Sequence, residues 1–130
     1  MSRVAIVAAA LGFAACDARE PPPRWAYVHA AILQPNCTTS GCHGALTAIT
    51  GLPLSNADEA YNVLTGRVCG EPYQPGFTPR NYVDPGSPER SLLIQRLLGT
   101  DVDVMPPDRP LPELEIDLVA QWIEEGAACD

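Results

Sequence analysis

Residues 37–44, Cys-Thr-Thr-Ser-Gly-Cys-His-Gly, place two thiols and an imidazole within seven positions. Several interpretations of these side chains compete. A disulfide, or two buried thiols beside a surface histidine, would need no cofactor. A zinc site would need further ligands from Cys69, Cys129 or His29, whereas zinc cysteines usually come in closely spaced pairs. A redox dithiol usually has two residues between its cysteines and no requirement for an adjacent histidine.

Covalent haem attachment is the fourth interpretation, and its usual motif is CxxCH. Cys37 and Cys42 would then form thioethers with the porphyrin vinyl groups, and His43 would coordinate the iron. The spacer here has four residues, Thr38 to Gly41. On a helix, thiols five positions apart lie about 140° apart around the axis, against about 60° for thiols three apart. The extra residues are therefore expected to loop out, and Thr, Ser and Gly turn readily.

Met105 is the candidate for a sixth iron ligand. It is the only methionine apart from Met1, and it precedes Pro106 and Pro107. The two prolines fix the backbone, so a side chain can be presented rigidly from a loop. Methionine also fills gaps in cores, so this interpretation depends on the haem motif. His29 is the only other histidine and hence the bis-histidine alternative, but we expect it on a helix surface.

The motif is followed by further short stretches in a fixed order. They are residues 83–93 (Val-Asp-Pro-Gly-Ser-Pro-Glu-Arg-Ser-Leu-Leu), 105–107 (Met-Pro-Pro), 114–116 (Leu-Glu-Ile) and 122–127 (Trp-Ile-Glu-Glu-Gly-Ala). This order resembles a class I c-type cytochrome domain, closest to the planctomycete and myxobacterial type of haem-binding module. The resemblance runs from about Trp25 to Ala127, and the order of the motifs is far more specific than any one of them.

The resemblance implies one covalently bound haem c, with thioethers at Cys37 and Cys42 and iron ligation by His43 and Met105. It also implies an all-α, cytochrome c-like fold in which three main helices and one short helix surround the haem between long Pro/Gly-rich loops. The longer spacer and the additional Cys69 and Cys129 depart from the common form.

Hydrophobic spacing predicts the helices. One begins near Trp25 and ends at Pro35, and a short one covers 57–65, with Asn56 as cap and Gly66 at its end. A third begins at Ser87 and closes at Gly99, and a last one covers about 112–125. The expected apolar stripe of the third helix is Leu92, Leu93, Ile94, Leu97 and Leu98. That of the last helix is Leu114, Leu118, Val119, Trp122 and Ile123. Residues 70–86 show no hydrophobic period and are expected to form a long loop, and no strand-like alternation appears.

Once Cys37 and Cys42 are assigned to haem, Cys69 and Cys129 remain. In an oxidising compartment these two thiols most simply pair, although two free thiols are the alternative. Closing a loop of about 60 residues adds about 4 kcal/mol in the chain-entropy model. The disulfide would clamp the C-terminal helix to the haem domain.

The N-terminus has the pattern of a bacterial lipoprotein signal. Residues 4–15 are apolar or small, a run too short to span a bilayer, and they lead into Cys16, which we expect to be lipidated. Plain secretion, with Cys16 in the discarded peptide, is the alternative. The chain is expected to divide into a signal peptide at 1–15, a proline-stiffened tether at 16–23 and a haem domain at 24–130. The mature protein is expected in the cell envelope or periplasm, anchored to a membrane by the lipid.

The amino-acid composition limits the kinds of molecule that the protein is expected to bind. After residue 15 the chain has seven arginines, no lysine and sixteen acidic residues, a formal charge of −9. Nucleic acid is disfavoured because phosphate binding needs a basic surface. Prolines make up about 11% of the chain, roughly double the usual share of about 5%, which indicates extensive loops. Candidates for holding haem propionates are Arg80, Arg90 and Arg96.

These observations predict a single-haem c-type cytochrome that transfers electrons to redox protein partners. With both axial positions filled there is no substrate site, so we do not expect an enzyme. The alternatives are a gas-binding or sensing haem module with a labile sixth ligand, and a haem-free envelope lipoprotein stabilised by disulfides or zinc.

Overall fold

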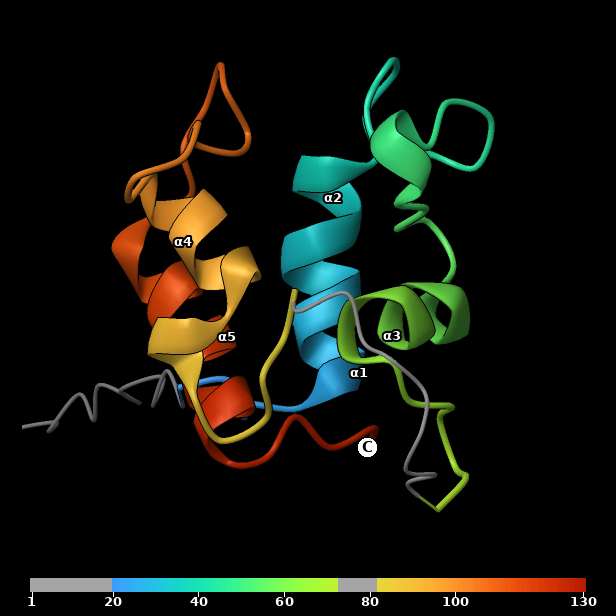
Figure 1. Cartoon of the computed structure of the whole chain (residues 1–130), viewed down its shortest axis with the longest axis vertical. Helices are drawn as coiled ribbons and strands as arrows, with labels where there is room; N and C mark the ends of the chain where they lie inside the picture. Colours follow the sequence, from blue (N-terminus) through green and yellow to red (C-terminus); the bar gives the residue numbers. More distant parts are fainter. Residues whose placement is uncertain (1–19, 73–81) are drawn as a thin grey trace, which may run out of the picture.

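A computed structural model describes residues 20–72 and 82–130 of the chain (Figure 1). Within those two ranges the protein consists of helices and loops without a strand, which confirms the all-α class. None of the helices in this part of the chain has the length and apolar character needed to cross a bilayer. The predicted signal peptide, the expected lipidation site Cys16 and the propionate candidate Arg80 lie outside the described residues.

The first helix runs without a break through three segments: α1 (Trp25–Tyr27), the π-helical η1 (Val28–Leu33) and α2 (Gln34–Cys37). The prediction that it ends at Pro35 is wrong. A proline in a regular α-helix clashes with the carbonyl four residues earlier. Here the preceding turn is π-helical, with the Gln34 N–H bonded to the His29 carbonyl, and Pro35 stands at the start of α2. The wider turn gives room to the proline ring, so the helix reaches Cys37.

The short helix α3 (Ala57–Thr65) has the predicted bounds. The Asn56 side chain accepts a hydrogen bond from the Glu59 N–H at 3.0 Å, and Gly66 ends the helix in the left-handed conformation at φ 68°. Both signals are local, because they depend on side chains within one turn of the helix ends.

The predicted helix from Ser87 to Gly99 is divided in the structure. A 3-10 turn, η3 (Pro88–Arg90), is followed by extended Ser91 and then by α4 (Leu92–Leu98), which Gly99 ends. The Ser91 hydroxyl is fully buried, donates to the Ser87 carbonyl at 3.0 Å and accepts from the Asp84 N–H at 2.9 Å. These two hydrogen bonds compete with helix continuation at that point.

The last helix is α5 (Glu113–Glu124), close to the predicted 112–125. Two residues assigned to apolar stripes are exposed: Leu98 at the end of α4 and Leu114 at the start of α5. The remaining α5 stripe packs against η1 and α4, and its buried members include Leu118, Val119, Trp122 and Ile123. In Figure 1, α4 and α5 lie on one side of the first helix and α3 on the other.

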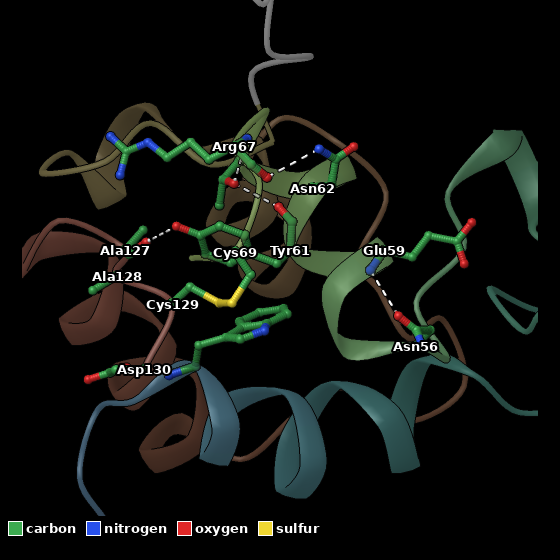
Figure 2. The surroundings of a disulfide bond; sticks show 12 residues. Asn56, Glu59, Tyr61, Asn62, Arg67, Cys69, Ala127, Ala128, Cys129 and Asp130 are labelled. Atoms are coloured by element: carbon green, nitrogen blue, oxygen red, sulfur yellow. Dashed lines mark hydrogen bonds between the residues drawn. A yellow bond between two sulfur atoms is a disulfide. The ribbon is translucent and has the colours of Figure 1, made fainter. Parts of the chain in front are cut away.

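An aromatic cluster and a disulfide hold the helices together at the end of the molecule near the C-terminus. The ring centroid of Trp25 lies 5.1 Å from that of Trp122 and 5.4 Å from that of Tyr61, which links α1, α5 and α3. Cys69, after α3, is joined to Cys129, after α5, in a disulfide (Figure 2). This is the pairing that the sequence suggests, and it ties the C-terminal helix to the rest of the domain.

Candidate functional site

A cavity of about 360 Å³ opens between the first helix and α4. Its first wall is contributed by the end of α2 and the chain that follows it: Asn36, Cys37, Cys42, His43, Ile49, Thr50, Leu52 and Leu54. The opposite wall comes from α4 and the loop after it: Leu92, Leu93, Arg96, Leu97, Met105, Pro106 and Pro107. Leu64 and Tyr82 complete the lining. Most of these side chains are apolar. The structure therefore brings the four proposed haem residues, Cys37, Cys42, His43 and Met105, to one cavity.

The spacer between the two thiols loops out. The helix ends at Cys37, and the Cys42 N–H then bonds to the Thr39 carbonyl at 3.0 Å, with Gly41 at φ 85°. The His43 N–H returns to the Cys37 carbonyl at 3.0 Å. These bonds close the extra residues into a compact turn, so Cys37 and Cys42 both reach the cavity despite the long spacer.

The His43 imidazole is fixed by a backbone carbonyl. Its Nδ1 lies 3.1 Å from the Leu52 oxygen. A carbonyl only accepts hydrogen bonds, so Nδ1 carries the proton. The lone pair of the neutral ring is then on Nε2, as it is in histidines that ligate metals and donate their other N–H to a carbonyl. Sequence reasoning missed Leu52, because nothing in the sequence identifies a backbone carbonyl as an acceptor.

His29 is buried, with 5% of its surface exposed, so the prediction that it lies on a helix surface is wrong. It is four positions after Trp25 and three before Ile32, and this spacing places it on the core face of the helix. Its Nε2 bonds to the Leu54 carbonyl at 2.9 Å, which satisfies the buried ring nitrogen. His29 does not line the cavity. As a bis-histidine partner of His43 it is therefore poorly placed.

Met105 is held on a loop that is bonded to α4. Its N–H donates to the Arg96 carbonyl at 2.8 Å, and the Arg96 guanidinium donates to the Asp103 carbonyl at 3.3 Å. At 37% exposure, the Met105 side chain lies at the edge of the cavity rather than in the core. The alternative that Met105 is a core-filling residue is thus not supported by its position.

Gly99 positions this loop. Its φ is 69°, and a Cβ there would lie 3.0 Å from the Val104 Cβ, next to Met105. We expect Gly99→Ala to destabilise the protein by about 2 kcal/mol, from the left-handed backbone and from the displaced Val104. Urea titration of the variant and the parent measures the difference in their free energies of unfolding. The matched control is Gly86→Ala, where φ is 84° but no atom lies within 4 Å, so only the backbone cost of about 1 kcal/mol applies. Equal losses in the two variants would show that the Val104 contact contributes nothing.

The bonding of the cysteines and the pKa of Cys37 distinguish between the disulfide, redox and zinc interpretations. Cys37 and Cys42 are free, so the four cysteines of the domain do not form two disulfides in this structure. Burial, with a smaller contribution from Cys42, raises the pKa of the Cys37 thiol to about 11. A reactive redox cysteine needs a lowered pKa instead. Cys69 and Cys129 are bonded to each other and cannot serve as zinc thiolates. Within residues 20–72 and 82–130, no group of three or more His, Cys, Asp and Glu side chains is placed to hold a metal ion.

Of the propionate candidates in the described ranges, only Arg96 lines the cavity. Arg90 is on the surface, where its guanidinium pairs with the Asp84 carboxylate at 2.7 Å. Hydrogen bonding to this carboxylate raises the pKa of Arg90.

Comparison of the chain with protein-family models, with curated proteins and with solved structures found no match.

Proposed function

We propose that the protein is a single-haem c-type cytochrome that transfers electrons outside the cytoplasm. The observation that supports this most is the convergence of four residues, Cys37, Cys42, His43 and Met105, on one apolar cavity. The two thiols and the imidazole come from one wall and the Met105 thioether comes from the opposite wall, an arrangement suited to a haem held between them. The resemblance to class I c-type cytochromes in the order of motifs supports the same proposal.

The residues that line the cavity fit a haem in donor chemistry. The cavity of about 360 Å³ lies in the usual range of about 300–1,000 Å³ for ligand and cofactor sites. His43 offers an imidazole Nε2 and Met105 a thioether sulfur, the donor pair of electron-transfer cytochromes. Arg96 is the cavity residue able to pair with a propionate.

When bound, the haem would supply a one-electron couple, and the chain would set its properties. Cys37 and Cys42 would hold it covalently, so the carrier would not lose it on collision with a partner. His43 and Met105 would both ligate the iron and would leave no site for a substrate, so the protein would act as a carrier rather than an enzyme. The thioether ligand would favour the ferrous state and raise the potential. Redox protein partners are proposed; their identity is open to experiment.

The experiment is expression with a haem-maturation system, followed by absorption spectroscopy in alkaline pyridine with dithionite. We expect a haem band that stays with the polypeptide through extraction with acidic acetone. A band that passes into the acetone would show that haem is bound without thioethers. A colourless protein would favour the haem-free envelope lipoprotein.

Met105→Ala tests the sixth ligand. We expect the variant to lose the spectrum of a six-coordinate haem, to bind carbon monoxide readily and to have a lower reduction potential, because the thioether is gone. Val104→Ala is the matched control, since it alters the same loop without removing a donor atom. If the oxidised and reduced spectra of Met105→Ala match those of the parent, Met105 is not the ligand. A parent protein that itself binds carbon monoxide as readily would favour the gas-binding module.

A further inference from the structure

His29 is a buried polar side chain for which the proposed haem chemistry has no role. Only 5% of its surface is exposed. Its Nε2 lies 2.9 Å from the Leu54 carbonyl oxygen, so Nε2 carries a proton and donates it. Burial of an imidazole is unfavourable without such a partner, and removal of the donor would leave the buried Leu54 carbonyl unsatisfied.

The partner of His29 belongs to the segment that holds His43. We call residues 52–54, Leu-Pro-Leu, the acceptor segment. Its Leu52 carbonyl accepts from His43 Nδ1 at 3.1 Å, and its Leu54 N–H donates to the His43 carbonyl at 2.8 Å. Leu52 and Leu54 are both buried and both line the cavity. One hydrogen bond thus connects His29 to the acceptor segment, and two connect that segment to His43.

The same helix carries His29 and Cys37. It therefore places one proposed thioether directly and, through His29, the carbonyl that orients the imidazole. Groups that hydrogen-bond to a metal-ligating histidine fix its ring orientation and raise its basicity. The thiol and the imidazole would then be positioned by one rigid element, although a looped spacer separates them in the sequence.

We propose that His29 is a positioning residue that holds the acceptor segment in place, so that the Leu52 carbonyl orients the His43 imidazole toward the haem iron. This inference rests on the proposed function. Without the His29 donor, the acceptor segment moves away from the first helix and the bond from His43 Nδ1 to Leu52 weakens. With haem bound, the His43 imidazole would then be a less basic ligand, and the reduction potential would rise.

The test compares matured, haem-loaded variants by reduction potential and by the electron paramagnetic resonance spectrum of the ferric protein. His29→Leu removes the donor, and we expect a higher potential and shifted ferric signals. His29→Gln keeps an N–H donor at a similar distance from the backbone, and we expect it to restore both toward the parent values. Val28→Ala is the control: Val28 is fully buried in the same helix, so this variant loses stability but keeps the parent potential and signals.

A purely structural role for His29 would lower the melting temperature of His29→Leu and leave its potential and ferric signals unchanged; that result overturns the proposal. If His29→Leu yields no folded holoprotein, His29→Asn replaces it, because the shorter amide does not reach the Leu54 carbonyl. Equal potentials and signals in His29→Asn, His29→Gln and the parent would then overturn the proposal. Failure of the proposed function is distinguishable, since the parent protein would in that case contain no covalent haem.

Discussion

The protein produced without haem attachment is expected to unfold without a cooperative transition. The reason is the size of the cavity: about 24 cal/mol per Å³ over about 360 Å³ amounts to at most about 9 kcal/mol, with water entry reducing the cost. Domains of this size have a total stability of about 5–15 kcal/mol. The lining leucines of both walls would also lose their packing partner.

Urea titration followed by far-ultraviolet circular dichroism measures this effect. The comparison is between the matured protein and the same chain expressed without a haem-maturation system. We expect a sharp transition in the first and a broad, shallow change in the second. Two sharp transitions at the same urea concentration would mean that haem contributes nothing to folding, and would favour the haem-free lipoprotein.

Loss of the Cys69–Cys129 disulfide is expected to lower stability by about 4 kcal/mol. The bridge spans a sequence separation of 60 residues, and the chain-entropy model gives about that value for such a loop. The double variant Cys69→Ala with Cys129→Ala therefore stays folded only if the haem and the other contacts of the C-terminal residues stabilise it enough. Neither cysteine lines the cavity, so the haem spectrum of the folded variant should match that of the parent.

The control for this variant is Tyr61→Phe. The Tyr61 hydroxyl donates to the Ala127 carbonyl at 2.9 Å and so holds the same C-terminal tail by one hydrogen bond (Figure 2). We expect this variant to lose about 1 kcal/mol. Urea unfolding of both variants separates covalent from hydrogen-bonded attachment. Equal losses in the two variants would refute a dominant role of the disulfide.

Local signals in the sequence were sufficient for part of this fold. The bounds of α3 follow from Asn56 and Gly66, because caps act within one helical turn. The helix through Pro35 and the break at Ser91 were not predictable in this way. The first depends on a π-helical turn. The second depends on the Ser91 hydroxyl, which donates to the Ser87 carbonyl and accepts from the Asp84 N–H.

The candidate site also has some residues that the sequence indicates and others that only the structure shows. Residue types and spacing indicated Cys37, Cys42 and His43, and a lone Met-Pro-Pro indicated Met105. The carbonyls of Leu52 and Leu54 that bond to His43 and His29 could not be inferred, because a backbone acceptor has no signature in the sequence. The core-face spacing of His29 relative to Trp25 and Ile32 was the signal that could have placed it inside.

The central claim is that haem is bonded to Cys37 and Cys42, and the intact mass of the matured protein under denaturing conditions tests it most directly. The comparison is with Cys37→Ala combined with Cys42→Ala, expressed and matured in the same way, so that any N-terminal processing or lipid cancels. We predict that the parent is heavier by one haem and two sulfur atoms. A difference of two sulfur atoms alone would contradict the account.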